Sequence, residues 1–427
     1  MLRPLHLLLL TALLPIAGTA EQCLVIGDSL TKEYEVEFPA LFPDNPESWD
    51  SRNWIEILHQ RRTGWFDTGL FSQNNDVRLV GHEYNWAFPG ATSTEIKSQI
   101  SNPFNFWWTD KLENHLKNIV ERVVIFAGGN DVDSYYGNIY NGASPPTYTN
   151  ATLSNLQWIV DYVRTQKPTL PIVLVAVPHL GCAPDVQLQY PTDPVKTARV
   201  TAALDTLNVQ LAAFAQSRGI GFAAGAYDLT KAMIDQPFRV GGIDFYKQAD
   251  MDARPRYLFS GDGFHPNTCA HAKIAQIVIN AFRAKYPASA ITTLGDKDIV
   301  TNILGLDPNI PFNEWIAAQG TPANQSGLLD DPDGDGLKNS VEFALQGASA
   351  VAFNALSPPT LEGASLTWNY HPNPIATEWG TVKAQYSSNL QDWQDVPAAN
   401  LAPQPDGSVN VQMSGTDRLF LRLSVSP

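Results

Sequence analysis

The sequence predicts an α/β sandwich followed by a small all-β domain, because its apolar pattern changes once along the 427 residues. Between Cys23 and Ile291, short apolar runs alternate with longer amphipathic stretches, whereas beyond Leu356 apolar residues recur at every second position. The first pattern is typical of a parallel sheet covered by helices, and the second of antiparallel strands. We therefore expect a three-layer α/β/α sandwich over residues 21–295, a connector over 296–355 and a β-sandwich-like module over 356–427.

The expected strands of the first domain are short apolar runs, at residues 23–26, 77–80, 123–126, 172–177 and 220–224. Between them, apolar residues at helical spacing predict helices around 153–163 and 204–214, and a final helix over 268–286. In the last domain, alternation at 366–370, 382–386, 409–413 and 419–425 predicts antiparallel strands joined by Asn-Pro and Asp-Gly turns.

The first twenty residues have the pattern of a secretory signal peptide. Arg3 and His6 form a polar start, residues 7–14 are apolar, and Gly18-Thr19-Ala20 provides a small-residue cleavage site. The apolar run is shorter than the roughly 20 residues that a membrane span requires, and no later stretch is long enough. We expect a protein exported to the periplasm or the extracellular space, cleaved near Ala20 and without a transmembrane segment.

The charge balance narrows the classes of partner. The chain has 28 Lys and Arg residues against 43 Asp and Glu residues, a formal net charge of −15. Proteins that coat nucleic acid need a basic footprint, so we expect no nucleic-acid partner. Nothing in the sequence indicates an oligomeric state.

Four polar motifs follow predicted strands or precede the last predicted helix. A serine at the carboxyl end of a strand lies where open α/β sheets place their ligands. Because the four segments can lie in loops at the same edge of one sheet, we expect their side chains to form one site. The motifs are Gly27-Asp28-Ser29-Leu30, Phe88-Pro89-Gly90-Ala91-Thr92, Gly128-Gly129-Asn130-Asp131 and Asp262-Gly263-Phe264-His265-Pro266.

Through these four motifs, taken in order, residues 21–290 resemble the GDSL/SGNH hydrolase family of serine esterases and lipases. The resemblance implies a flavodoxin-like sandwich in which Ser29 is the nucleophile, His265 the general base and Asp262 the carboxylate that orients the imidazole. It also implies an oxyanion hole formed by the backbone N–H groups of Ser29 and Gly90 and the side-chain amide of Asn130. No cofactor is expected for catalysis.

These residue types suit acyl-ester hydrolysis. A serine hydroxyl becomes a nucleophile when a histidine within hydrogen-bond distance removes its proton, and a carboxylate fixes the tautomer of that histidine. Donors placed in advance then stabilise the tetrahedral oxyanion. Because Asp262 and His265 are three residues apart, one loop can present both.

The three cysteines remain in the expected mature chain. Cys182 follows the fourth predicted strand and Cys269 follows His265 by four residues, so both are expected near the active-site edge. A disulfide between Cys182 and Cys269 and a pair of packed free thiols are both compatible with the sequence.

An acidic turn at residues 331–342 has the spacing of an EF-hand loop. With Asp331 at position 1, the ligand positions carry carboxylate, amide or backbone oxygens and Gly336 occupies the glycine position. A single loop of this kind indicates a structural Ca²⁺ ion between domains rather than a calcium sensor. The expected ligands are Asp331, Asp333, Asp335, Leu337, Asn339 and Glu342.

Together these features predict a secreted carboxylic ester hydrolase, with acetylated carbohydrate favoured as substrate because of export, loop aromatics and the appended module. Two alternatives remain: a lipase or lysophospholipase acting on lipid esters, and a catalytically inert binding or adhesion protein. The sequence does not indicate the acyl group, the leaving alcohol or the ligand of the last module.

Overall fold

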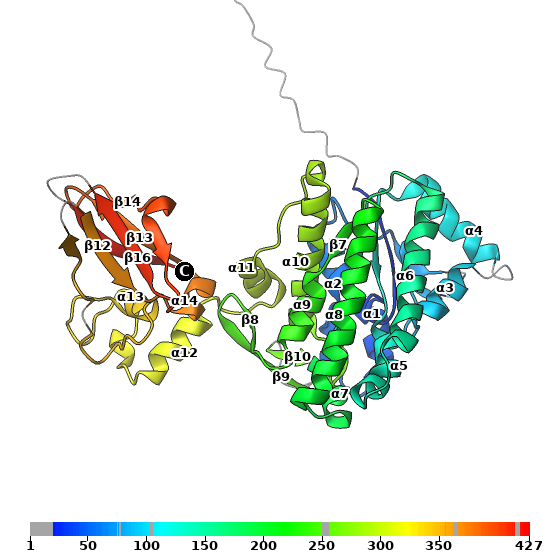
Figure 1. The fold of residues 1–427 in the computed structure, drawn as a ribbon, viewed down its shortest axis with the longest axis horizontal. Helices are drawn as coiled ribbons and strands as arrows, with labels where there is room; N and C mark the ends of the chain where they lie inside the picture. The colour runs from blue at the N-terminus through cyan, green and yellow to red at the C-terminus, as the bar shows by residue number, and fades with distance from the viewer. Residues whose placement is uncertain are drawn as a thin grey trace, which may run out of the picture.

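The computed structural model describes residues 20–74, 76, 78–101, 106–249, 256–354, 356–362, 365–414 and 419–427. The expected signal peptide falls almost entirely on residues 1–19, which lie outside the described residues. Figure 1 shows a large α/β body joined to a smaller C-terminal body that carries the last strands. Within the described part of the chain, no helix is both long enough and apolar enough to cross a membrane.

The large body is built on a five-stranded sheet in the order β4-β1-β5-β6-β7, and all four strand pairings are parallel. This 2-1-3-4-5 order is that of flavodoxin-like folds, as expected. Every residue of β1 and β5 is buried, as the continuous apolar runs predict for a sheet covered on both faces. The strands are β1 (Cys23–Gly27), β4 (Asn85–Ala87), β5 (Arg122–Phe126), β6 (Ile172–Val175) and β7 (Gly221–Ala223).

One predicted strand is wrong. Residue 77 lies outside the described residues, and Val80 begins β3 (Val80–His82), which pairs only with β2 (Phe71–Gln73) in an antiparallel hairpin. The second strand of the central sheet is instead β4, whose residues Asn85, Trp86 and Ala87 lack the branched apolar pattern of a strand. A tertiary contact stabilises β4, because the Arg78 guanidinium lies 3.9 Å from the centre of a Trp86 ring and donates to the Asn85 carbonyl.

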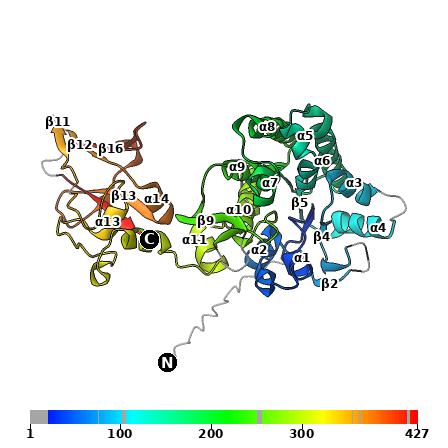
Figure 2. The same cartoon turned by 90° about the horizontal axis from the view of Figure 1, so that it is seen from below.

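Helices cover both faces of the sheet, as Figure 2 shows. On one face α2 (Trp54–Arg61) packs against α10 (Thr268–Lys285), and on the other α6 (Pro146–Gln166) packs against α3 (Ser93–Ser101) and α8 (Pro194–Ser217). The remaining helices of this body are α1 (Tyr34–Leu41), α4 (Phe106–Asn114), α5 (Gly129–Tyr140), α7 (Pro184–Gln189) and α9 (Gly225–Ala232). The three-layer α/β/α prediction is therefore confirmed.

A small sheet, in the order β10-β9-β8, lies between the two bodies. Its strands are β8 (Phe238–Val240), β9 (Ile243–Ala249) and β10 (Tyr257–Phe259), and β10 runs directly into the segment that carries Asp262 and His265. The first part of the connector, α11 (Asp296–Asp298) and the π-helical turn Ile299–Ile303, packs against the α/β body. Ile299 and Val300 are buried in its hydrophobic core.

The C-terminal body contains two small antiparallel sheets, β11-β12-β16-β15 and β14-β13-β17, so the predicted all-β region is confirmed. Trp368 and Val411 of the first sheet share a core with Ala384 and Leu423 of the second. The strands are β11 (Thr360–Glu362), β12 (Ser365–Tyr370), β13 (Thr381–Ser387), β14 (Gln394–Asp395), β15 (Leu401–Pro403), β16 (Val409–Ser414) and β17 (Phe420–Ser426). Helices α12 (Ile310–Ala318), α13 (Asn339–Phe343) and α14 (Pro374–Trp379) complete this body.

Candidate active site

Ser29, His265 and Asp262 lie in one hydrogen-bonded row at the carboxyl edge of the central sheet. Ser29 follows β1, and the other two come from the segment between β10 and α10. The Ser29 hydroxyl oxygen is 3.0 Å from His265 Nε2, and His265 Nδ1 is 2.5 Å from Asp262 Oδ2. The two segments are 236 residues apart in sequence, and the parallel sheet brings them together.

The other carboxylate oxygen of Asp262 is held by its own loop. Asp262 Oδ1 accepts hydrogen bonds from the Ser260 hydroxyl at 2.7 Å and from the backbone N–H groups of Phe264 and His265 at 2.9 and 3.0 Å. Ser260 is almost wholly buried, and its backbone N–H donates to the His265 carbonyl. The carboxylate is therefore fixed on one side while its second oxygen faces the imidazole. Ser260 was not predicted from the sequence, in which its position two residues before Asp262 is the one signal available.

The same contacts shift the two ionisable groups in opposite directions. Burial alone would raise the pKa of the Asp262 carboxyl, but its hydrogen bonds to His265 and Phe264 lower that pKa to about 2. Burial alone would lower the pKa of His265, but the hydrogen bond and charge of Asp262 raise it above its ordinary value. The pair thus favours an ionised carboxylate beside an imidazole of increased basicity.

Two aromatic rings of α1 pack on the His265 imidazole. The rings of Tyr34 and Phe38 each lie 6.4 Å from it, edge to face, and both side chains are fully buried. The Tyr34 hydroxyl is in turn 2.7 Å from Nε2 of the buried His271. These contacts restrict the ring of His265, and because they are purely tertiary the sequence analysis did not find them.

The three expected oxyanion donors come from the loops that follow β1 and β4 and from the start of α5. The backbone N–H groups of Ser29 and Gly90 make no hydrogen bond within the described residues, so both are free to donate. Gly90 has φ +72° and open space where a Cβ would lie. Asn130, at the start of α5, donates one amide hydrogen to the Ala91 carbonyl at 3.1 Å, which leaves the second for another acceptor.

Asp131 connects the two loops that carry these donors. Its carboxylate accepts from the Ser93 backbone N–H and hydroxyl, both at 2.6 Å, and from the Thr152 hydroxyl. Because Ser93 begins α3 directly after the Gly90 turn, Asp131 fixes the position of Gly90 relative to Asn130. Its contacts are those of a structural residue.

A small cavity of about 50 Å³ opens beside Ser29. Apart from Ser29, Asn130 and a few other polar groups, its wall is apolar. The apolar side chains come from the ends of β1, β5 and β6, from the segments that follow them, from the His265 loop and from α10. They include Leu30, Phe126, Pro178, Leu180, Ala183, Phe264, Pro266 and Ile274.

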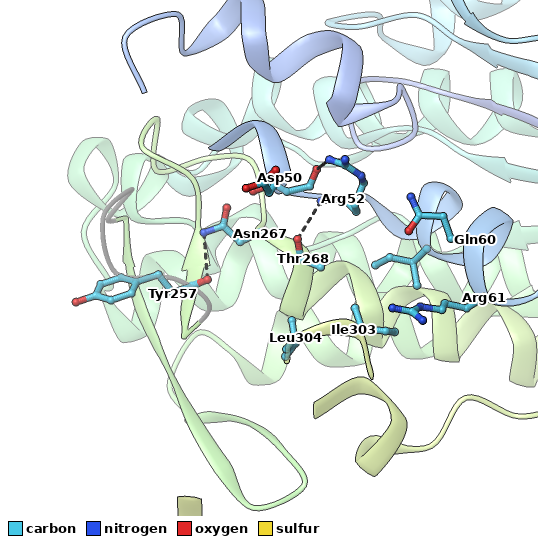
Figure 3. A pocket seen from close by; sticks show the side chains of 11 residues that line it. Asp50, Arg52, Gln60, Arg61, Tyr257, Asn267, Thr268, Ile303 and Leu304 are labelled. Atoms are coloured by element: carbon cyan, nitrogen blue, oxygen red, sulfur yellow. Dashed lines mark hydrogen bonds between the residues drawn. The ribbon is translucent and has the colours of Figure 1, made fainter. Parts of the chain in front are cut away.

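A larger hollow of about 320 Å³ lies across the His265 loop from this cavity. Phe259 and Pro266 line the small cavity, whereas Tyr257 and Asn267 line the large one, so the same backbone separates them. Figure 3 shows Arg52 joined to Thr268 and Asn267 joined to Tyr257 around this hollow, with Gln60 and Arg61 on its far side. Its lining mixes hydrogen-bonding and apolar groups.

The three cysteines are buried free thiols, so the disulfide alternative for Cys182 and Cys269 is not realised in the structure. The thiols of Cys182 and Cys269 lie against different carbonyl groups: Cys182 Sγ is 3.2 Å from the His179 oxygen, and Cys269 Sγ is 3.4 Å from the Tyr257 oxygen. The alternative of packed free thiols is the one observed.

The acidic turn adopts the folded conformation that an EF-hand-like ligand set requires. Carboxylate oxygens of Asp331, Asp333 and Asp335 lie within 4.8 Å of one another. Gly336 has φ +93°, a conformation that favours glycine, and its N–H donates to Asp331 Oδ2 at 3.0 Å. The local sequence thus closes the turn with the three carboxylates converging.

Glu342, at position 12 of the turn, is fully buried, yet neither of its carboxylate oxygens has a hydrogen-bond partner among the described residues. Burial and the charges of Asp333, Asp335 and Asp331 raise the pKa of Glu342 to about 7. A buried carboxylate facing three others is strongly unfavourable without a cation. Two unpaired oxygens on Glu342 match the bidentate ligand that Ca²⁺ takes at this position.

A five-stranded parallel sheet with a Ser-His-Asp row at its carboxyl edge places the chain among α/β proteins with a hydrolase-type site. The sequence profile of the GDSL-like Lipase/Acylhydrolase family matches residues 25–273. The chain belongs to this family, and its large body has the GDSL fold.

Similar solved structures include a lipase/acylhydrolase from Enterococcus faecalis, 14% identical, with a TM-score of 0.31, covering 62% of this chain and 96% of that one. A protein from Bacteroides fragilis assigned as an acylhydrolase is also 14% identical, with a TM-score of 0.31, covering 62% and 87% of the two chains. A comparison with curated proteins finds no match.

Proposed function

We propose that the protein is a secreted serine esterase that removes short acyl groups, chiefly acetyl, from carbohydrate esters. The observation that carries the proposal is the row of contacts from Ser29 Oγ to His265 Nε2 at 3.0 Å and from His265 Nδ1 to Asp262 at 2.5 Å. This is the distance range in which a histidine removes a serine proton and a carboxylate orients the histidine.

In the proposed reaction, Ser29 Oγ attacks the ester carbonyl carbon while its proton passes to His265 Nε2. The tetrahedral oxyanion accepts hydrogen bonds from the N–H groups of Ser29 and Gly90 and from the free amide hydrogen of Asn130. Collapse breaks the ester C–O bond, and the leaving alcohol takes the proton from His265. A water molecule then repeats the sequence on the acyl-enzyme and releases the carboxylic acid.

The cavity beside Ser29 supports a short acyl group. Its volume of about 50 Å³ and its apolar wall suit a methyl or ethyl group better than a long chain. This favours an acetylesterase over a lipase or lysophospholipase.

The test uses p-nitrophenyl esters of increasing chain length, followed by acetylated xylan and pectin. Activity should be highest for the acetyl ester, and Ser29→Ala should lower kcat by about 10⁶-fold. Ser154→Ala, which changes an exposed serine on α6, is the matched control and should leave the activity unchanged. A Ser29→Ala variant with near-normal activity would exclude the mechanism, and a preference for long chains would favour the lipase alternative.

We also propose one structural Ca²⁺ ion at residues 331–342, supported by the converging carboxylates of Asp331, Asp333 and Asp335 and by the buried Glu342 carboxylate, whose two oxygens are unpaired among the described residues. These four side chains, with the Leu337 carbonyl and Asn339 at the remaining positions, would hold it. The ion would neutralise the buried carboxylates and order the turn. It takes no part in the ester chemistry, because the turn lies outside the large body.

A further inference from the structure

The C-terminal body has an open groove of about 530 Å³ that belongs to neither the esterase site nor the calcium turn. One wall is the turn that follows α13, the other is the end of β12, and Phe353, Asn354, Leu356 and Ser357 complete it. The lining residues are Leu345, Gln346, Gly347, Ala348, Phe353, Asn354, Leu356, Ser357, Asn369, Tyr370 and His371.

The groove combines an exposed aromatic ring with an apolar floor. Phe353 is 71% exposed, although a ring of this size is normally buried. Tyr370 is buried in the floor, where its ring lies 5.5 Å from that of Trp368. The groove therefore offers apolar ring surface to a ligand with apolar C–H faces.

Hydrogen-bonding groups without a charge surround this surface. Gln346, Asn369 and His371 are exposed, and the Gln346 amide has no hydrogen-bond partner among the described residues. Asn369 accepts a hydrogen bond from Asn410 through Oδ1, which leaves its Nδ2 free to donate. None of the lining residues is Asp, Glu, Lys or Arg, although two carboxylates contact lining residues: Asp335 accepts from the Asn354 N–H at 3.0 Å, and Asp406 lies 3.8 Å from His371 Nε2.

The groove is held open by backbone contacts, so a ligand would not have to order it. The Gln346 N–H donates to the His371 carbonyl at 2.8 Å, and Leu345 forms a β-bridge with Pro372, which fixes one wall to the other. The Asn354 N–H donates to Asp335 Oδ2 at 3.0 Å, which ties the Phe353 segment to the acidic turn. A preformed site loses less conformational entropy when it binds.

We propose that this groove binds neutral carbohydrate. A sugar ring presents C–H groups on its faces and hydroxyl groups at its edge, which match the Phe353 ring and the surrounding amides and imidazole. The lining contains no Lys or Arg, and the carboxylates of Asp335 and Asp406 beside it repel anions, which argues against recognition of a uronate or phosphate group. This binding goes beyond the proposed esterase function and does not depend on it, because the groove and Ser29 lie in different bodies.

The test is affinity electrophoresis of the full-length protein through gels containing unacetylated polysaccharides, which carry no ester and therefore separate binding from hydrolysis. The neutral probes are hydroxyethylcellulose, debranched xylan and galactomannan, and the acidic probe is polygalacturonate. We expect at least one neutral polysaccharide to slow the protein and polygalacturonate to have no effect.

Phe353→Ala should raise the apparent dissociation constant at least about tenfold, the change expected from the loss of one stacked ring. Leu361→Ala is the matched control, because Leu361 is 73% exposed on β11 but outside the groove, and it should bind as the unchanged protein does. Thermal melting of both variants verifies the fold. The proposal is overturned if no neutral polysaccharide slows the protein, if polygalacturonate slows it more, or if both variants lose binding equally.

Discussion

Asp262 uses its two carboxylate oxygens for different purposes. Oδ1 accepts three hydrogen bonds from its own loop, and Oδ2 accepts one from His265. Because Oδ1 is fixed, Oδ2 cannot rotate away when His265 takes up a proton. The negative charge of the carboxylate therefore stays beside the imidazolium and stabilises it. Ser260 is therefore a positioning residue for Asp262, and it acts on catalysis only through that carboxylate.

The raised pKa of His265 predicts the acid side of the pH profile. A general base must be neutral, so kcat/KM should fall as the pH drops through the pKa of His265, which lies above its ordinary value of 6.5. Asp262→Asn removes the charge that raises this pKa, so the acid limb should move to lower pH while kcat falls about 10⁴-fold. The profile of p-nitrophenyl acetate hydrolysis measures both. An acid limb that stays in place in Asp262→Asn would show that another group controls it.

The variant Asn130→Ala should show a different kinetic change, because the second amide hydrogen of Asn130 has no acceptor among the described residues and is available to the oxyanion. Asn130→Ala should lower kcat by about 10²–10³-fold with a much smaller change in KM. Asn150→Ala, at an exposed position of α6, is the control. A change confined to KM would instead make Asn130 a substrate-binding residue.

At the scale of single elements, the sequence predicted best what is local. The turn at 331–342 closes on its own side chains, and the strands β1, β5 and β6 are continuous apolar runs, so spacing alone located them. Strand β4 could not be found in this way, because it lacks a continuous apolar run and the contact of Arg78 with Trp86 exists only in the folded chain. The role of Tyr34 and Phe38 was not predicted either, because their contact with His265 exists only after folding.

The acidic turn at residues 331–342 predicts that calcium stabilises the folded protein. Calcium that binds only the folded protein should raise its unfolding free energy by about 2.7 kcal/mol at a concentration of 100 times the dissociation constant. Glu342→Gln removes the bidentate ligand and should abolish this gain, measured as the melting temperature with calcium and with EDTA. The exposed Glu378 of α14 supplies the control, Glu378→Gln, which should keep the gain.

Without calcium, Glu342→Gln should be at least as stable as the unchanged protein, because it no longer buries a carboxylate beside three others. An unchanged protein whose melting temperature is the same in calcium and in EDTA would contradict the calcium site.

In the whole molecule, the two bodies meet at the β8–β9 hairpin. A Cβ on Gly242, which has φ +78°, would lie 2.8 Å from the Ile375 carbonyl and 3.2 Å from Trp379 Cβ, so the hairpin turn touches α14 closely. Arg256, directly before β10, forms an ion pair with Glu314 of α12. The C-terminal body thus rests on the small sheet whose last strand leads to Asp262 and His265. No described residue of the C-terminal body lines the cavity beside Ser29 or the hollow across the His265 loop.

This arrangement predicts how a chain ending after Asp307 should behave. Such a chain keeps Ile299 and Val300, which are buried in the core of the large body, and it keeps every residue of the proposed site. Its kcat/KM for p-nitrophenyl acetate should therefore equal that of the full-length protein. On an acetylated neutral polysaccharide its activity should fall by up to about 10²-fold, because the carbohydrate groove no longer raises the local substrate concentration. Phe353→Ala in the full-length chain should also lose activity on the polymer alone, by a smaller factor because it removes one ring of the groove. If the folded, shortened chain instead lost its activity on p-nitrophenyl acetate, the contact at Gly242 would be required to hold the His265 loop in place.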